Sequence, residues 1–351
     1  MAEPSYCILY VGPLAYGQTC RQRLGALEAL GHQVVGLDTL PPAVAARTQA
    51  LMERIRRKIW GPRDLGRINE QILTLAAAHH PDILWIDKGL IIKPDTLIQV
   101  KKLFPRTVAV SYSPDDMLNP DNQSNYYLQG IPLYDLHITT KSYNVPELKA
   151  LGARAVIRVN NAYCPKTHRP MELSSEERQQ LGGPVGFIGA YERPRAELLV
   201  WLARQGVPVK VWGHWPRRLG NGLKNLTVMG RPLWGEDYAK AICAFDINLG
   251  FLRKKNRDLQ TSRTMEIPAC GAFLLAERTP EHLALFEEGR EAEFFSSPEE
   301  LLDKVRHYLA HGEERRRLAA AGRARCLRSG YSNPATLAGI LNHIAVHHFG
   351  G

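Results

Sequence analysis

The sequence predicts an α/β protein with two doubly wound parallel sheets, because one pattern of elements occurs twice. Near the start, an apolar run at 6–11 leads through a glycine-containing loop and a helix to a second strand at 33–37. The same order of strand, glycine, helix, glycine and strand recurs over 185–212. This order is the βαβ opening of a doubly wound sheet. Two such openings in 351 residues, a length typical of two domains, predict twin Rossmann-like domains.

The first domain is expected over residues 1–165. Its predicted elements are a largely helical stretch at 39–80 and further strands at 83–87, 107–111, 135–139 and 155–159. Asp115 and Asp116 follow the strand at 107–111 and are candidate site residues, because the carboxyl ends of parallel strands form the ligand crevice. A turn or N-cap role after Pro114 is the alternative. Gly12, in the loop after the first strand, lets the backbone approach a ligand.

The second half begins after a polar stretch at 166–184, which is expected to be the interdomain linker. The second domain is expected over 185–330, and 331–351 as a terminal helix. The predicted strands are 185–189, 207–212, 226–229, 245–251 and 272–276, and the predicted helices are 194–205, 238–243, 281–288, 298–309, 313–327 and 334–348.

The stretch 255–278 combines a polar loop, a short helix and a buried strand, and it is the main candidate site. The helix is predicted to open at Thr261 or Ser262 and to stop at Gly271. A helix start carries partial positive charge and unpaired N–H groups, so it is a ready anion site. The residues expected to contact a diphosphate are Gly12, Arg193, Thr261, Ser262, Arg263 and Thr264, and Arg195 lies in the same feeding loop as Arg193. An ordinary surface helix with solvated charges is the alternative.

Composition narrows the classes of partner. The net charge of +10 is compatible with phosphorylated ligands, an anionic membrane face or nucleic acid. The basic runs at 54–58 and 315–317 lack interleaved aromatics, so no nucleic-acid binding is expected. The six cysteines form no metal-ligand spacing, and the terminal histidines lack nearby acids, so no metal site is expected. We expect a cytoplasmic protein without signal peptide or transmembrane segment, and peripheral membrane contact stays open.

Longer motifs carry a resemblance to a known family. The segment TMEIPACGAFLLAE at 264–277 resembles the C-terminal domain of retaining glycosyltransferases of the GT-B architecture, glycosyl transferases group 1. The segments NRDLQTSRTMEIPACG, VSYSPDDMLNP and LYDLHITTKSYNVPELKALGA resemble its CgeB-like branch, the spore-maturation-protein-like proteins. The resemblance implies a GT-B fold, with both domains facing a central cleft and a C-terminal helix crossing back onto the first domain.

The resemblance also implies an activity and roles for particular residues. It implies a glycosyltransferase of the hexosyltransferase type (EC 2.4) that uses a UDP-, GDP- or dTDP-sugar and an unidentified glycan, protein or small-molecule acceptor, without a metal or other cofactor. The family's two acids, separated by seven residues, fall on Asp258, which is shorter than usual, and Glu266. They are expected at the donor sugar and ribose. The expected catalytic residues are Asp115, Asp116 and Glu266, and the expected base contacts are Gly230, Arg231 and Leu233.

Two other functions remain open on the same fold. A nucleotide-sugar epimerase would turn the donor over without an acceptor. A non-catalytic protein that reads a nucleotide-sugar or a glycan would bind the donor without transfer, and the shortened acid Asp258 is the feature that keeps this alternative.

Overall fold

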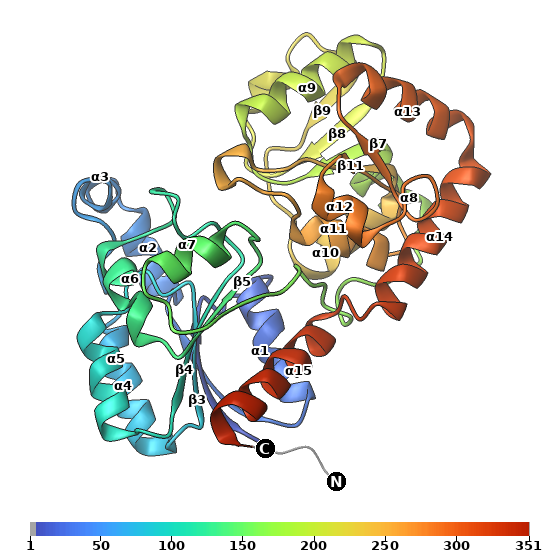
Figure 1. Cartoon of the computed structure of the whole chain (residues 1–351). Coiled ribbons are helices and arrows are strands. Elements are labelled where there is room, and N and C mark those ends of the chain that lie inside the picture. The colour runs from blue at the N-terminus through green and yellow to red at the C-terminus, as the bar shows by residue number, and fades with distance from the viewer. Residues whose placement is uncertain (1–4, 351) are drawn as a thin grey trace. The chain divides into compact units, whose positions relative to one another are not determined.

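The computed structural model describes residues 5–350, which divide into two compact units (Figure 1). Unit 1 runs to Asn160 and takes up the C-terminal segment from Asn333, and unit 2 comprises Asn161–Ser332. Each unit contains one six-stranded sheet in which every pairing is parallel. The predicted α/β class with two parallel sheets is therefore confirmed.

Unit 1 has the strand order β2-β1-β3-β4-β5-β6. Its strands are β1 (Cys7–Gly12), β2 (Gln33–Asp38), β3 (Ile83–Asp87), β4 (Val108–Ser113), β5 (Leu136–Thr139) and β6 (Val156–Arg158). Its helices are α1 (Thr19–Ala29), α2 (Pro42–Gln49), α3 (Leu51–Trp60), α4 (Ile68–His79), α5 (Pro94–Leu103), α6 (Asn125–Gly130), α7 (Asn144–Ala150) and α15 (Asn333–Ile344), with a 3-10 turn at Ile131–Leu133 and a π turn at Ala345–Phe349. The strand order reverses between β1 and β3, which is the usual ligand crevice of such sheets.

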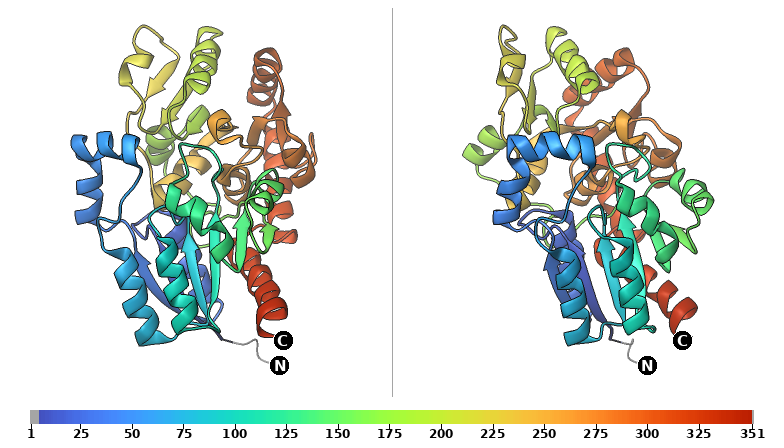
Figure 2. Two further views of the ribbon diagram at one scale, coloured as in Figure 1. Left: turned by 60° about the vertical axis from the view of Figure 1, so that its left-hand side comes forward. Right: turned by 90° about the vertical axis from the view of Figure 1, so that its left-hand side faces the viewer.

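Both faces of the sheet in unit 1 are covered by helices, which explains why its strands read as continuous apolar runs. On one face, Ile8 and Trp85 pack with α1 and with Leu337 and Ile340 of α15. Figure 1 shows α15 beside α1, although α15 follows unit 2 in the sequence. On the other face α4 and α5 lie side by side, as Figure 2 shows, and bury β-strand residues such as Leu84.

Unit 2 has the strand order β12-β11-β10-β7-β8-β9. Its strands are β7 (Gly183–Ile188), β8 (Val209–Trp212), β9 (Leu226–Val228), β10 (Phe245–Gly250), β11 (Leu274–Glu277) and β12 (Glu293–Phe295). Its helices are α8 (Ser175–Leu181), α9 (Arg193–Arg204), α10 (Gly235–Ala244), α11 (Ser262–Ala269), α12 (Pro280–Leu285), α13 (Pro298–Ala310) and α14 (Gly312–Arg328), with 3-10 turns at Arg217–Gly220 and Lys254–Asn256. Counted from β7, this is the Rossmann order 3-2-1-4-5-6. The order reverses between β7 and β10, and this position is called the switch point of the sheet.

Two short elements of unit 2 go beyond the sequence pattern. Residues 166–184, expected as a linker, lie within unit 2 and contain α8, which a capping box between Ser174 and Glu177 nucleates. The strand β12 is only three residues long, too short for a periodic signal. No helix within residues 5–350 combines the length and the apolar character needed to cross a bilayer.

Candidate functional site

The switch point of the sheet in unit 2 brings two helix starts together. The strands β7 and β10 are direct neighbours, and each leads through a loop into a helix, α9 or α11. Because both strands are parallel, both helices begin at the carboxyl edge of the sheet. Their first-turn N–H groups and the positive ends of their dipoles therefore serve the same region, which favours an anionic ligand.

Two arginines connect these helix starts. Arg195, in the first turn of α9, donates from Nη2 to the carbonyl oxygen of Phe251 at 3.2 Å, just after β10. Arg263, in the first turn of α11, donates from Nε to the carbonyl oxygen of Ile188 at the end of β7. The guanidinium carbons of Arg195 and Arg263 lie 5.5 and 6.0 Å from the ring centroid of Phe187. Two cations thus share one aromatic ring at the switch point.

Arg195 is a buried cation with an unused donor. Its residue is 4% exposed, and among the described residues its Nε has no hydrogen-bond partner. Burial lowers the pKa of Arg195 to about 10; the Arg263 and Arg253 charges add to the lowering, and Glu192 opposes it. The group stays protonated at neutral pH, so its positive charge remains next to those of Arg263 and Arg253. The Nε atom lies 4.0 Å from Oε2 of Glu192, an ion pair without a hydrogen bond. A bound anion nearby would relieve the repulsion among the cations.

The loop after β7 is shaped to admit these side chains. A Cβ on Gly189 would lie 2.7 Å from Cζ of Phe187 and 3.3 Å from Nη2 of Arg263, so a larger residue would press the Phe187 ring and crowd that guanidinium. Glu192, at the end of the loop, accepts a hydrogen bond from Nε of Arg253 at 3.1 Å. This carboxylate partly balances the cations when no ligand is bound.

Glu266 lies one turn into α11 and is held by two neutral side chains. It is 5% exposed, and its Oε2 accepts a 2.5 Å hydrogen bond from the hydroxyl of Tyr238. His168 Nδ1 accepts from the backbone N–H of Cys164, so the neutral ring carries its proton on Nε2, 3.8 Å from Oε1 of Glu266. Burial lowers the pKa of His168 and raises that of Tyr238. The carboxylate therefore has a fixed orientation.

The first turn of α11 is anchored from the side. Thr264 Oγ1 accepts from the backbone N–H of Thr261 at 3.1 Å and lies 2.9 Å from Nε2 of His282. His282 Nδ1 donates to the carbonyl oxygen of Glu277 at 2.6 Å, so Nε2 accepts the Thr264 hydroxyl proton. Burial lowers the pKa of His282, which keeps the ring neutral. The Thr264 side chain thus positions the helix start, whereas Thr261 and Ser262 are half-buried there.

Two residues predicted to contact the donor have other partners. The Asp258 carboxylate accepts from Nδ2 of Asn256 at 2.6 Å and from the backbone N–H of Arg253 at 3.3 Å, so it organises its own loop. The Arg193 side chain is 84% exposed and pairs with Glu197 at 2.7 Å along α9. Arg195, which was absent from the predicted diphosphate set, is the residue of this turn that lies beside Arg263.

The residues predicted to bind the base follow β9. The carbonyl oxygen of Arg231 accepts from the backbone N–H of Gly213 at 2.9 Å, and the Arg231 guanidinium lies 4.9 Å from the ring of Trp212. Gly213 has φ 142°, and a Cβ there would lie 2.1 Å from the carbonyl oxygen of Gly189. The loop after β8 therefore contacts both the loop after β7 and the loop after β9. Leu233 is buried, and Gly230 has φ 69°.

Gly12, Asp115 and Asp116 lie in unit 1, at the carboxyl edge of its sheet. Asp115 forms an ion pair with Lys88, the residue after β3, and its side chain is 19% exposed. Asp116 is 1% exposed and accepts from Nδ2 of Asn144 at 3.0 Å, so it holds the local loop. Asp115 is the more accessible of the two acids. Within residues 5–350, no three His, Cys, Asp or Glu side chains are grouped to hold a metal ion.

Comparisons with known proteins agree with this architecture. Residues 193–342 match a family model described as glycosyl transferase-like, and a search of curated proteins gave no match. The Anabaena protein HepE, solved in complex with UDP, is 14% identical with a TM-score of 0.65, covering 97% of this chain and 99% of that one. Sucrose-phosphate synthase from Thermosynechococcus elongatus is also 14% identical, with a TM-score of 0.66 and coverages of 96% and 98%.

A third similar structure comes from a different class of enzyme. A putative UDP-N-acetylglucosamine 2-epimerase from Listeria monocytogenes is 13% identical, with a TM-score of 0.59 and coverages of 99% and 98%. Together with the two parallel sheets, these similarities show the GT-B fold that the motifs predict. The family match begins at Arg193, the first residue of α9, and includes both helix starts of the switch point.

Proposed function

We propose that this protein is a glycosyltransferase that moves a sugar from a nucleotide-diphosphate-sugar to an acceptor, with the donor bound by unit 2. The observation that carries the proposal is the placement of Arg195 and Arg263 at two helix starts on the sheet's switch point. The glycosyl transferase-like match over the same region supports it. The motif resemblance supports the finer assignment to the CgeB-like branch and to the hexosyltransferases.

In the proposed reaction the donor diphosphate lies against the Arg195 and Arg263 side chains and the first N–H groups of α11, those of Ser262 and Arg263. When the glycosidic bond breaks, negative charge develops on the departing diphosphate. Donors already aimed at that charge stabilise the transition state without reorganising, and such preorganised groups are usually the largest catalytic contribution. The arginines and helix dipoles supply positive charge in the place that a metal ion occupies in other transferases, which supports a metal-independent reaction.

We assign the ribose and the base of the donor to other residues of unit 2. Glu266, oriented by Tyr238, accepts hydrogen bonds from the ribose hydroxyls, and the loop with Gly230, Arg231 and Leu233 contacts the base. UDP is the first base to test, because HepE was solved with UDP. The Asp258 carboxylate, which accepts hydrogen bonds from Asn256 and the backbone of Arg253, shapes the loop in front of α11 and acts on the donor sugar only through that loop.

Of the paired acids in unit 1, Asp115 is the one we assign to the acceptor. Its side chain remains partly exposed beside Lys88, whereas Asp116 is enclosed by its loop. Burial acts to lower the pKa of Lys88, but the charge and hydrogen bond of Asp115 outweigh it and the pKa is raised, so the Lys88 ammonium stays charged. In an inverting reaction Asp115 would serve as the base, and in a retaining one it would position the acceptor hydroxyl.

The first experiment is a thermal-shift screen with UDP-, GDP- and dTDP-sugars. A ligand at 100 times its dissociation constant adds about 2.7 kcal/mol to the free energy of unfolding, which is a clear shift. The sugar that gives the largest shift is then incubated with candidate acceptors, and release of the nucleoside diphosphate is followed. The proposal fails if no nucleotide-sugar shifts the melting temperature of the protein.

An epimerase is the second candidate, since the Listeria structure shares the fold. Proton NMR of the bound sugar without any acceptor distinguishes the two activities. An epimerase converts the sugar while the nucleotide bond stays intact, and a transferase leaves it unchanged until acceptor is added. A binding protein gives the thermal shift with neither reaction.

A further inference from the structure

Unit 1 contains an inner pocket of about 200 Å³ at the carboxyl ends of its strands. Val11 of β1 and Ile86 of β3 line it, and so do Leu40 and Val44 from the segment that follows β2. The strand order of this sheet reverses between β1 and β3, so the pocket lies at the position where doubly wound sheets bind ligands. Its lining residues all belong to unit 1. The pocket is therefore a candidate binding site that unit 1 forms by itself.

Apolar side chains make up most of the lining of the inner pocket, which limits what can bind there. An apolar cavity of about 150 Å³ holds a benzene ring, so the inner pocket has room for one aromatic ring. A sugar ring would place most of its hydroxyls against apolar side chains and would lose their hydrogen bonds to water. The inner pocket therefore favours an aromatic ring over a carbohydrate.

Positive charge borders the inner pocket on the side of α3. Arg57 and Arg63 both line the pocket. Arg63 pairs with Glu53 at 3.1 Å, and Arg56 holds the same carboxylate at 2.9 Å. Arg57 has no ion-pair partner among the residues that the structure describes. Three arginines thus surround one carboxylate, and this excess of positive charge favours a ligand with an anionic group.

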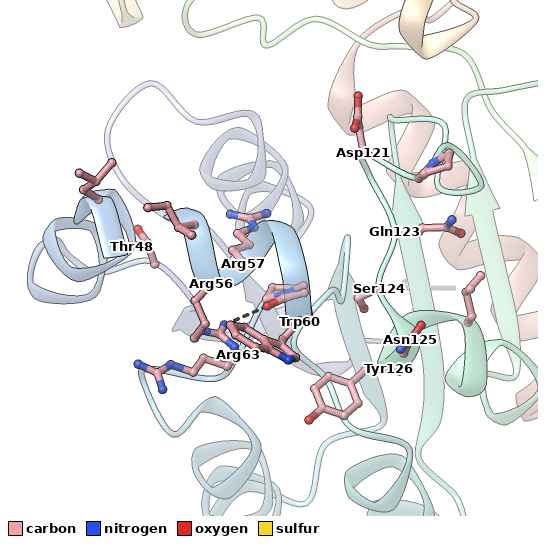
Figure 3. A pocket seen from close by; sticks show the side chains of 16 residues that line it. Thr48, Arg56, Arg57, Trp60, Arg63, Asp121, Gln123, Ser124, Asn125 and Tyr126 are labelled. Carbon is pink, nitrogen blue, oxygen red and sulfur yellow. Dashed lines mark hydrogen bonds between the residues drawn. The ribbon is translucent and has the colours of Figure 1, made fainter. Parts of the chain in front are cut away.

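A larger hollow of about 1140 Å³ adjoins the inner pocket. The two cavities share four lining residues, Thr48, Arg57, Pro62 and Arg63. Figure 3 shows Trp60 of α3 and Tyr126 of α6 on opposite sides of the hollow, with Arg63 on the side of Trp60. A small apolar pocket with a few charged groups at its border is typical of sites for small molecules.

The inner pocket also reaches the acid that we assign to the acceptor. Lys88 lines the pocket and forms the ion pair with Asp115. Its φ of 69° is left-handed, an uncommon and costly conformation for a residue with a side chain, and such residues cluster at functional sites. The turn after β3 thus connects the pocket to the Asp115 carboxylate.

We propose that the inner pocket binds the acceptor, and that this acceptor is a small aromatic compound with a hydroxyl and an anionic substituent. The ring would occupy the inner pocket, and the anionic group would meet Arg57. The acceptor role rests on the proposed transferase activity. In the transfer, the hydroxyl oxygen bonds to the anomeric carbon of the sugar while the bond to the diphosphate breaks. The hydroxyl proton passes to Asp115 in an inverting reaction, or to the departing diphosphate in a retaining one.

The test is a titration of the full chain, without nucleotide, followed by ligand-observed NMR. The probes are 4-hydroxybenzoate, its neutral analogue 4-hydroxybenzamide, and glucuronate, which is an anion without an aromatic ring. We expect 4-hydroxybenzoate to bind about tenfold or more tightly than either of the others, because it combines a buried ring with a charge-assisted hydrogen bond.

Variants separate the two parts of the site. Arg57→Gln should remove the preference for 4-hydroxybenzoate over 4-hydroxybenzamide. Val44→Phe, which fills the pocket, should abolish binding of both aromatic probes, and Leu40→Ser, at a 38% exposed position, should weaken both without disturbing the core. The matched control is Arg47→Gln on α2, because this exposed arginine lines neither cavity. The melting temperature of each variant verifies folding.

Several outcomes would overturn the proposal. These are equal affinities for the three probes, tightest binding of glucuronate, and an effect of Arg47→Gln as large as that of Arg57→Gln. A protein that binds a nucleotide-sugar but not 4-hydroxybenzoate keeps the proposed function and refutes this acceptor class. A protein that binds 4-hydroxybenzoate but no nucleotide-sugar refutes the donor site and the acceptor role, but not the pocket. With both ligands bound, release of the nucleoside diphosphate and formation of the aryl glycoside are expected.

Discussion

Arg195 and Arg263 share the ring of Phe187, and each donates a hydrogen bond to the backbone that precedes the other's helix. Arg263 reaches the end of β7, from which the chain enters α9, and Arg195 reaches the start of the loop between β10 and α11. The two arginines therefore hold the loops after β7 and β10 in place, and they also supply positive charge at the switch point. In the proposed donor site, the same side chains would organise the loops and meet the diphosphate.

Replacing Arg195 with alanine should weaken UDP binding by about tenfold or more, since a charge-assisted hydrogen bond contributes about 1.5–3 kcal/mol. The matched control is Arg193→Ala, at another arginine in the first turn of α9. It should change the dissociation constant for UDP little, because the Arg193 side chain points into solvent beside Glu197. Isothermal titration calorimetry with UDP measures both constants. The opposite ranking of the two variants would place the diphosphate at Arg193.

Removing the hydroxyl of Tyr238 should lower the free energy of unfolding, because the Glu266 carboxylate loses its hydrogen-bond donor. Tyr238→Phe leaves a buried carboxylate oxygen without its 2.5 Å donor, a loss of about 1–3 kcal/mol in the free energy of unfolding. Urea denaturation measures this loss. Tyr191→Phe is the control, since that ring is 42% exposed. Equal stability of the two variants would mean that water replaces the Tyr238 hydroxyl at no cost.

Stability should fall in acid partly through His282. Burial lowers its folded-state pKa below the usual value of 6.5, so the unfolded chain takes up a proton first as the pH falls. The free energy of unfolding should therefore decrease below about pH 6.5, down to the folded-state pKa. His282→Gln should flatten this slope, whereas His214→Gln, at an exposed position, should not. Urea unfolding at a series of pH values provides the slopes, and an unchanged slope in His282→Gln would contradict this assignment.

The buried ion pair of unit 1 should be essential for its folding. Asp87 Oδ2 accepts from Nη2 of Arg23 at 2.6 Å and from the Tyr10 hydroxyl at 2.7 Å, and its side chain is fully buried. Asp87→Asn leaves the Arg23 charge uncompensated, so we expect a loss of about 3–5 kcal/mol in the free energy of unfolding. Glu70→Gln, which breaks an exposed pair with Arg67, should cost no more than about 1 kcal/mol. A mild effect of Asp87→Asn in urea denaturation would show that the pair is dispensable.

The candidate site in unit 2 was predictable in outline and not in detail. The start of α11 and the arginines of the α9 turn follow from capping residues and sequence position, which are local features. The pattern did not separate Arg195 from Arg193, because residues two apart in a helix point about 200° apart and only packing shows which direction faces the sheet. It also did not separate Asp115 from Asp116, since the side chain that holds Asp116 in place, Asn144, is 28 residues along the chain.

By itself, the sequence determined the two parallel sheets, the glycines that end the helices and the loop-to-helix transition at Thr261. These follow from hydrophobic periodicity and backbone conformation, which neighbouring residues fix. Only the tertiary structure decided that Thr264 is bound to His282 and that Tyr238 orients Glu266. Those contacts join residues distant in sequence, and their energies depend on burial, which no local pattern specifies.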